Sequence, residues 1–453
     1  MRPYKIFTIC LLGVSTLFTL IAQAETVQSG GSTTVFQEGP NAFAMPLANI
    51  SRINRRAHVV GNSFFNKNWV FSPSSTTARD GLGPLFHARS CSGCHVRDGR
   101  GAPEKGDKVS VGLLFRLHFP GSKQGDPNLG VQLAVNAAPG IEPEGRVEIT
   151  YEPVREKLND QASISLRRPN YTLHAKTIYG RPHPQTLLSP RLAPPLVGLG
   201  LLEAVEKDTI LALTDPDDEN RDGISGRASY ALNPETQQTE LGRFGWKAGQ
   251  PNLRLQAAVA FWRDIGITSS IHPKEDFTPA QAKILNPSTS GAPEIDDAKL
   301  NRVVTYLRTL APPAQRTPSA EKIIMGGELF ARAGCAKCHT PILKTGPYAP
   351  LDELKNQLIR PYTDLLLHDM GEALSDGIDK PGISGREWRT PPLWGIGLTE
   401  TVNGNAFYLH DGRARSLEEA IMWHGGEGLA AKQAYANFPR ESQQLLLQFL
   451  NSL

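Results

Sequence analysis

Two copies of one five-residue pattern limit what this chain can fold into. CSGCH at residues 91–95 and CAKCH at residues 335–339 each place two cysteines three positions apart, with a histidine directly after the second. The chain has five cysteines, and the remaining one, Cys10, lies in an apolar segment at the N-terminus. Each motif must therefore form a short turn that presents two sulfur atoms and one imidazole together.

Three kinds of chemistry use cysteines at this spacing: zinc binding, a redox disulfide and covalent haem attachment. A zinc ion needs four ligands, but the two pairs are 244 residues apart (335 − 91). A redox disulfide has no use for the histidine that follows both pairs. In haem attachment each thiol adds to one vinyl group and the histidine binds the iron. The pattern therefore predicts two covalently bound c-type haems, held by Cys91, Cys94 and His95, and by Cys335, Cys338 and His339.

The N-terminal segment predicts the compartment. Arg2 and Lys5 precede an apolar run over residues 6–21 that ends in AQA at 22–24, the arrangement of a cleaved secretory signal. The run is short for a membrane span, and no second segment reaches its hydrophobicity. We expect a signal peptide over residues 1–24 and a mature chain without a membrane span, exported to the bacterial periplasm.

The composition narrows the choice of partners. The net charge is +3, and removing Arg2 and Lys5 with the signal peptide leaves about +1 (3 − 2). No basic run stands out, which argues against nucleic acid and anionic membranes as partners. A hydrophobic fraction of 40% suffices for packed cores, while 35 prolines and 42 glycines predict many loops.

Two amphipathic helices indicate the domain boundaries. DDAKLNRVVTYLRTL places its apolar residues on one helical face, and the prolines of APPAQRTPSA at 311–320 cannot continue that helix. A similar helix, ESQQLLLQFLNSL, closes the chain. We expect an N-terminal domain over 25–311, a linker over 312–318 and a C-terminal cytochrome c domain over 319–453.

An internal repeat supports this division. LAPPLVGLGLLEAV at 192–205 and RTPPLWGIGLTETV at 389–402 share the frame PPL-x-G-x-G-L-x-E-x-V, and each copy follows one cysteine pair. The first half has about 47 extra residues before its copy (97 against 50), and part of them, VEITYEPV, predicts a short strand pair. We therefore expect a mainly α protein of two cytochrome c-like haem domains, the N-terminal one enlarged by loop-rich and short β insertions.

Several stretches resemble a known family. They are VFSPSSTTARDGLGPLFHARSCSGCHVRDGRG, YTDLLLHDMGE, SGREWRTPPLWGIGLTE and FYLHDGRARSLEEAIMWHGGE. With these stretches and its two ordered haem motifs, the chain resembles the bacterial di-haem cytochrome c peroxidase superfamily. Within it, the chain is most similar to the di-haem oxidoreductase branch, also labelled peroxidase or thiol oxidoreductase-like. The thiol label does not suit these residues, because all four mature cysteines are predicted to be bound to haem.

The resemblance also implies a distal ligand for the C-terminal haem. In the superfamily this ligand lies 14 residues beyond a histidine in a PY-x-H-x-G stretch, and here that spacing leads from His410 to His424. Peroxidases have methionine there, so the resemblance implies a bis-histidine, low-spin haem of lower potential. Met370 is a competing ligand and Met422 is two residues out of register. The alternative for His424 is an ordinary helix histidine.

The N-terminal haem has no evident distal ligand. When the internal repeat is used to transfer the position of His424 to the N-terminal half, that position falls on Ala260 or Phe261, and neither side chain binds iron. The loop after His95 contains no histidine, unlike that of the superfamily's peroxidases. Five other histidines are candidates that we interpret as structural: His58, His87, His118, His174 and His183. We expect an open or water-occupied distal side, which makes this the substrate-reactive iron.

Two further features leave alternatives open. Trp246 is a candidate relay of oxidising equivalents between the haems, as a tryptophan is in relatives, and equally a buried core indole. Asp218, Asn220 and Asp222 match the opening of an EF-hand loop, although position 12 is Ser229 rather than glutamate. A Ca²⁺ loop and an acidic turn are equal alternatives there.

Three functions are compatible with two such haems. The first is a periplasmic, peroxidase-like di-haem oxidoreductase, in which a small cytochrome or cupredoxin donates electrons to the C-terminal haem and peroxide or O₂ reacts at the N-terminal haem. The second is an electron carrier without substrate turnover. The third is haem-dependent oxidation of a partner protein or an organic substrate. The sequence favours the first.

Overall fold

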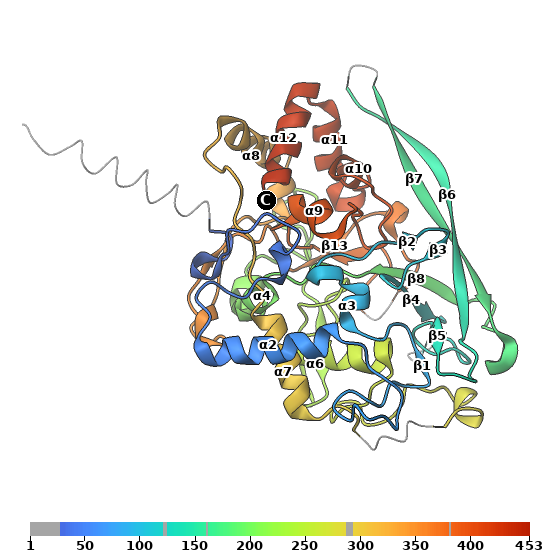
Figure 1. The fold of residues 1–453 in the computed structure, drawn as a ribbon. Coiled ribbons are helices and arrows are strands. Elements are labelled where there is room, and N and C mark those ends of the chain that lie inside the picture. The colour runs from blue at the N-terminus through green and yellow to red at the C-terminus, as the bar shows by residue number, and fades with distance from the viewer. Residues whose placement is uncertain (1–27, 121–124, 160–161, 287–292, 380–381) are drawn as a thin grey trace, which may run out of the picture.

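Short helices joined by long loops, with a β region beside them, make up the fold, which is taken from a computed structural model (Figure 1). The structure describes residues 28–120, 125–159, 162–286, 293–379 and 382–453. The predicted signal peptide, residues 1–24, lies outside the described residues. Within the described ranges, no helix combines the length and the apolar character needed to cross a membrane.

A pair of crossed helices frames the first cysteine motif. α2 (Arg52–Asn66) is N-capped by the side chain of Ser51 and packs against α7 (Asp297–Arg308). A Cβ atom on Gly61 of α2 would collide with the backbone carbonyl of Arg302 in α7. Glycine at this position therefore permits the close approach of the two helices.

The same crossing recurs around the second cysteine motif. α8 (Glu321–Arg332) packs against α12 (Arg440–Ser452). A Cβ atom on Gly326 would collide with the carbonyl of Leu445 in α12. One arrangement of helices thus lies on both sides of the predicted linker, residues 312–318, although that boundary itself stays a prediction.

The other helices are short. α3 (Cys91–Cys94) is a single turn that carries the first cysteine pair. α6 (Leu253–Ala260) packs against α7 and continues into a π-helical turn, η5 (Phe261–Ile265). The remaining α-helices of the described chain are α4 (Leu199–Ala204), α5 (Lys207–Leu211), α9 (Thr399–Asn403), α10 (Leu417–Met422) and α11 (Leu429–Asn437).

The strands pair in twos, all antiparallel. β4 (Leu113–His118) pairs with β8 (Leu187–Leu192), with Leu113 opposite Leu192. β6 (Gly145–Lys157) and β7 (Ser163–Ala175) form a long ribbon along one side of the molecule (Figure 1). The smaller pairs are β1 (Leu85–Phe86) with β5 (Asn136–Ala137), β2 (Glu104–Lys105) with β3 (Lys108–Val109), β9 (Tyr230–Asn233) with β10 (Gln238–Leu241), β11 (Leu343–Lys344) with β12 (Leu358–Ile359), and β13 (Leu367–Asp369) with β14 (Glu387–Arg389).

The β6–β7 ribbon connects the N-terminal half to the C-terminal helices. The amide of Asn159 donates to the carbonyl of Ala436 at 2.8 Å. Lys432 of α11 pairs with Glu156 of β6 at 3.1 Å. Leu166 of β7 is 1% exposed and belongs to the hydrophobic cluster of the C-terminal helices. The ribbon, which belongs to the N-terminal half of the sequence, therefore packs against the C-terminal helices.

The expectation of a mainly α protein is wrong. The chain is 32% helical and 19% strand, and its described strands form seven two-stranded sheets. Two causes account for the difference. The β6–β7 ribbon is longer than the short insertion that VEITYEPV predicted, because each of its strands has 13 residues, with burial that alternates along β6 apart from one break at Glu152–Pro153. Many proline- and glycine-rich stretches form turns and isolated bridges instead of helix.

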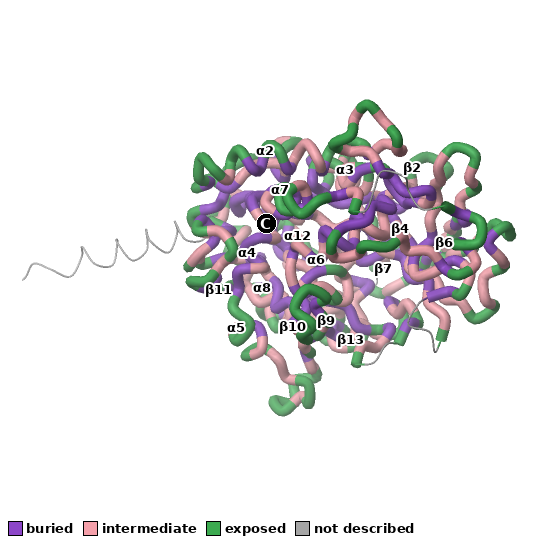
Figure 2. The backbone as a smooth tube through the Cα atoms, turned by 90° about the horizontal axis from the view of Figure 1, so that it is seen from below, coloured by how far each residue is buried: buried purple, intermediate pink, exposed green. Residues whose placement is uncertain are grey.

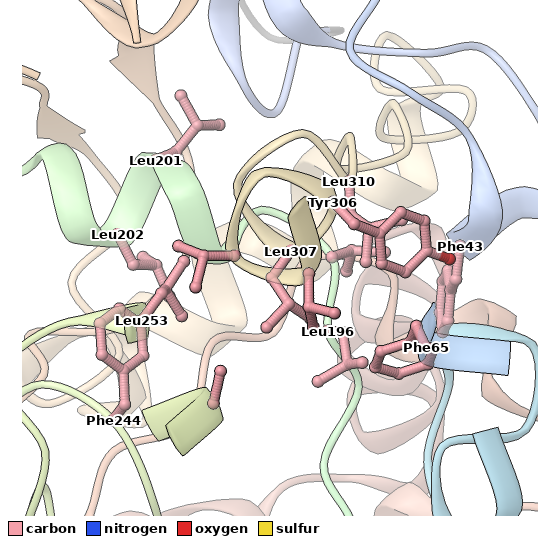
Figure 3. Close-up of a cluster of buried hydrophobic side chains, with 14 of the residues drawn as sticks. Phe43, Phe65, Leu196, Leu201, Leu202, Phe244, Leu253, Tyr306, Leu307 and Leu310 are labelled. Atoms are coloured by element: carbon pink, nitrogen blue, oxygen red, sulfur yellow. The ribbon is translucent and has the colours of Figure 1, made fainter. Parts of the chain in front are cut away.

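Buried residues gather in the middle of the molecule, and exposed residues form its outer turns (Figure 2). The largest cluster includes side chains from both sides of the predicted linker, such as Leu300 and Trp394. Figure 3 shows part of this cluster, in which Phe65, Leu196 and Leu307 lie around α7. These three side chains also line the cavity described next.

Candidate haem sites

A cavity of about 750 Å³ lies against the first cysteine pair. Its wall includes Cys91, Cys94 and His95, which come from α3 and the residue that ends it. Residues of α6, η5, β4 and β8 form other parts of the wall. The volume falls within the range of ~300–1,000 Å³ that is common for cofactor pockets.

The imidazole of His95 is held by one ring nitrogen. Its Nδ1 lies 2.8 Å from the carbonyl oxygen of Pro194, so Nδ1 carries the proton and donates it, leaving the Nε2 lone pair available for a metal. Burial lowers the pKa of His95, which keeps the ring neutral at ordinary pH. The Phe65 ring lies 6.3 Å from the imidazole, measured between ring centroids. This is the environment expected of a proximal iron ligand.

The cysteines of this motif are poorly suited to dithiol exchange. Burial raises the pKa of Cys91 to about 12 and raises that of Cys94 further above its usual range. A thiol with a raised pKa is a poor redox nucleophile, because the thiolate is the reactive form. Within the described ranges, all four cysteines are free of disulfide bonds.

Three arginines test whether the cavity suits a haem. Arg100, Arg116 and Arg191 line it, and each has a buried guanidinium nitrogen without a hydrogen-bond partner among the described residues. Burial lowers the pKa of each to about 10, so all three remain charged at neutral pH. Buried cations need anionic partners, and the propionates of haem are anions that reach such groups. The residues therefore fit haem.

The second motif repeats the geometry of the first. Cys335 begins a 3₁₀ turn, and His339 Nδ1 lies 2.9 Å from the carbonyl oxygen of Tyr362. Burial lowers the pKa of His339 to about 4. The Phe330 ring of α8 lies 6.4 Å from the imidazole, as Phe65 of α2 does from His95. Both motifs therefore present a neutral imidazole with a free Nε2.

His424 and Met370 lie together near this second site. His424 Nδ1 lies 2.7 Å from the carbonyl oxygen of Ala420, so its Nε2 is also available. A Cβ atom on Gly428 would lie 3.1 Å from His424 Cδ2 and 3.3 Å from Met370 Cε. Burial lowers the pKa of His424, and the electrostatic influence of His424 on the pKa of His339 places the two imidazoles in one neighbourhood. The choice of His424 over Met370 stays a prediction. Met422 is 1% exposed and packs in the hydrophobic cluster of the C-terminal helices.

Ala260 and Phe261, which the internal repeat predicts to be equivalent to His424, both line the cavity of the first site. Of the five candidate histidines, His118 lines it as well. The others contact protein groups elsewhere: His58 with Thr309, His87 with the Val111 carbonyl, His174 with Glu148, and His183 with the ring of Phe119. Besides His95, the described wall thus contains His118, with Ala260 and Phe261 at the positions that the repeat predicts to be equivalent to His424.

Comparison with known proteins identifies the family. The chain matches the model of a family described as "Di-haem oxidoreductase, putative peroxidase" over residues 23–113 and 180–453. The chain belongs to this family. A search of curated protein sequences finds no match. The family confirms the predicted resemblance and establishes haem as the cofactor class. The unmatched residues, 114–179, contain most of β4 and the whole β6–β7 ribbon.

A run of aromatic side chains connects the two sites of this di-haem oxidoreductase. Trp246 lines the cavity and donates its indole N–H to the Leu192 carbonyl at 2.7 Å. Its ring lies 6.4 Å from that of His410, which stacks on Trp388 at 3.7 Å. Trp388 lies opposite His368 in the β13–β14 pair, and His368 Nδ1 is 3.6 Å from Cys338 Sγ. Trp246 is therefore the first member of a chain of rings.

Sequence reasoning missed Trp388 and His368 in this run. Both lie in stretches that carry the family resemblance, SGREWRTPPLWGIGLTE and YTDLLLHDMGE. Their proximity depends on the antiparallel pairing of two three-residue strands, which are too short for a periodicity signal. Spacing along the chain could therefore not have found them.

The acidic loop is held by its own hydrogen bonds. The amide of Asp222 donates to Asp218 Oδ1 and to Asn220 Oδ1, both at 2.9 Å. The Asp222 carboxylate pairs with Lys337 at 3.1 Å. Among the described residues, no group of three or more His, Cys, Asp or Glu side chains is arranged to hold a metal ion. These contacts suit an acidic turn, and calcium binding here stays a prediction.

Proposed function

We propose that the protein is an exported c-type di-haem oxidoreductase that reduces a small oxidant, hydrogen peroxide or O₂, at its N-terminal haem. Cys91 and Cys94 would attach one haem and Cys335 and Cys338 the other. A small cytochrome or a cupredoxin would donate electrons. The predicted signal peptide over residues 1–24 and the haem family support the periplasm as the compartment.

One observation carries the division of labour between the haems. His424 has its Nε2 available and influences the pKa of His339, whereas Ala260 and Phe261, the positions that the internal repeat predicts to be equivalent, line the cavity that contains His95. An iron held by two histidines must lose a ligand before a substrate binds. An iron beside an alanine and a phenylalanine keeps one side accessible. The N-terminal site would therefore react with the oxidant and the C-terminal site would store and pass electrons.

The residues of this chain set the conditions of the reaction. When bound, the haem groups supply the redox chemistry. The Pro194 and Tyr362 carbonyls hold the His95 and His339 imidazoles in one tautomer, which would leave each Nε2 free to bind iron. Arg100 and Arg191 would pair with propionates and hold the first haem in its cavity.

The aromatic run supports a route for electrons between the sites. The run is Trp246, His410, Trp388 and His368, and it begins at the cavity wall and ends beside Cys338. Burial lowers the pKa of His410 to about 3, so this ring stays neutral and adds no charge to the route. Electrons from the C-terminal haem would cross along these rings.

Turnover measured on the purified protein tests the proposal. The protein is mixed with hydrogen peroxide or with O₂ and with a reduced small cytochrome, and oxidation of the cytochrome is followed optically. We expect oxidation that depends on one of the two oxidants, together with a high-spin ferric signal from one haem. Two low-spin haems and no oxidant-dependent turnover would support an electron carrier instead.

A further inference from the structure

Strand β4 presents a polar face to the first haem cavity. Leu114, Arg116 and His118 alternate along the strand, and all three line the cavity. Leu113 and Phe115, on the other face, are at most 1% exposed and pack in the hydrophobic cluster of the β region. The alternation of side chains in a strand therefore directs Arg116 and His118 toward the same cavity.

The position of Arg116 places β4 on the side of the predicted open iron face. Arg116 forms a β-bridge with Gln132. The Gln132 side chain donates to the Arg263 carbonyl at 3.1 Å and to Asp264 Oδ1 at 2.9 Å, and both acceptors belong to η5. η5 begins at Phe261, one of the two positions equivalent to His424. β4 therefore approaches the haem from the side where the C-terminal site has its distal ligand.

Arg116 has an unused donor at this place. Its Nη1 is buried and has no hydrogen-bond partner within the described part of the chain. Burial lowers the pKa of Arg116 to about 10, so the guanidinium is a cation at neutral pH. A buried cationic donor without an acceptor stabilises an anion or a partial negative charge that forms beside it.

We propose that His118 and Arg116 are the distal catalytic residues of the N-terminal haem, acting on a hydroperoxide, the simplest being hydrogen peroxide. This inference rests on the proposed function and names peroxide, rather than O₂, as its oxidant. The His118 imidazole transfers a proton between the two peroxide oxygens. The Arg116 guanidinium stabilises the negative charge on the oxygen that leaves.

The step balances with the donor already proposed. In the overall reaction, hydrogen peroxide takes up two electrons and two protons and yields two waters. The O–O bond breaks, and His118 accepts a proton from the oxygen nearer the haem and gives it to the other oxygen, which leaves as water. The two electrons come from the reduced cytochrome or cupredoxin through the two haem sites. Proton transfer of this kind contributes about 10²–10⁴ in rate.

Both residues lie in the segment that the family model does not match. The match stops at residue 113 and resumes at residue 180, so Arg116 and His118 belong to the β insertion of this chain. The strand partner β8, at Leu187–Leu192, lies within the matched part, and Arg191 and Leu192 also line the cavity. An insertion anchored on the shared core thus adds an arginine and a histidine to a wall that already contains Gln256 of α6 and Arg263 and Asp264 of η5.

Variants of the haem-loaded protein test the proposal. His118→Leu removes proton transfer, His118→Glu keeps a group that can carry a proton, and His174→Leu changes another histidine of the insertion that contacts Glu148 instead of the cavity. The rate of reaction of the ferric protein with hydrogen peroxide is measured by stopped-flow absorbance. We expect a loss of about 100-fold or more in His118→Leu, partial recovery in His118→Glu and no change in His174→Leu.

The ferric spectrum separates catalysis from iron ligation. We expect the spin state of His118→Leu to equal that of the wild type, and Arg116→Leu to slow the peroxide reaction by about 100-fold with the same spectrum. A wild-type rate in His118→Leu overturns the inference. A low-spin haem that becomes high-spin in His118→Leu also overturns it, because His118 would then be an iron ligand. If the wild type reacts with O₂ and not with peroxide, this inference fails while the proposed function stands; if it reacts with neither, both fail.

Discussion

The two haem-motif regions share a framework and differ on one side of it. In both, a helix crosses a later helix at a glycine, Gly61 in one and Gly326 in the other. In both, a phenylalanine of the first helix lies about 6 Å from the proximal imidazole, and a backbone carbonyl holds the Nδ1 of that imidazole. The difference lies in the predicted distal side: His424 is the predicted ligand in one region, whereas Ala260 and Phe261 line the cavity together with β4 in the other. The proposed division between electron storage and substrate reaction therefore depends on this side of each region and not on the shared helices.

The largest expected effect is the loss of a whole haem. Replacing Cys335 and Cys338 by serine should leave one covalent haem, because the two cysteine pairs occupy separate regions. The mass of the denatured protein and haem staining after electrophoresis measure this. The matched variant replaces Cys91 and Cys94 by serine, and it should retain the C-terminal haem. Zinc in the purified protein, or reactive thiols in the mature wild type, would contradict covalent haem attachment.

The next effect concerns the distal side of the C-terminal haem. His424→Ala should convert one of the two haems from low-spin to high-spin, since the predicted sixth ligand is removed. Electron paramagnetic resonance of the ferric protein reports the change. Met370→Ala is the matched control, because Met370 lies against the same glycine, Gly428, and should leave the spectrum unchanged. If Met370→Ala alone raises the high-spin signal, the ligand assignment is wrong.

A stability comparison tests the shared framework itself. Gly326→Ala should lower the free energy of unfolding by about 1–3 kcal/mol, because the added Cβ collides with the Leu445 carbonyl. Gly327→Ala on the same helix is the control, since its Cβ would meet Phe449 at 3.4 Å, an ordinary contact distance. Chemical denaturation of the holoprotein gives both values. Equal stability of the two variants would show that the crossing does not depend on Gly326.

A smaller effect concerns the connection between the sites. Trp246→Phe should slow inter-haem electron transfer by about tenfold, or about 1.4 kcal/mol in the barrier, because the smaller ring loses contact with His410. Cyanide affinity at the N-terminal haem should stay the same. Flash reduction followed at two wavelengths measures the transfer rate. An unchanged rate would mean that the Trp246–His410 pair is not on the route.

The sequence predicted the family and the cofactor class better than the architecture. The C-x-x-C-H spacing and the PPL-x-G-x-G-L repeat depend on local turns, so they could be read directly. The strand pairing of the β insertion could not be predicted in this way. Strand β4 pairs with β8, about 70 residues away, and the periodicity of a single strand does not reveal its partner. For the same reason His118 was interpreted as structural: only the pairing shows that it shares a cavity with His95. The choice of His424 over Met370 rests on spacing, and the structure brings both to one place.

Cyanide titration of the two single-haem proteins tests the central claim, that the N-terminal haem has the open side. The variant lacking Cys335 and Cys338 keeps that haem and should bind cyanide directly. The variant lacking Cys91 and Cys94 keeps the bis-histidine haem and should bind none at the same concentrations. Absorbance in the Soret region follows both titrations. Cyanide binding to the C-terminal haem alone would reverse the roles of the two sites, and binding to neither would establish an electron carrier.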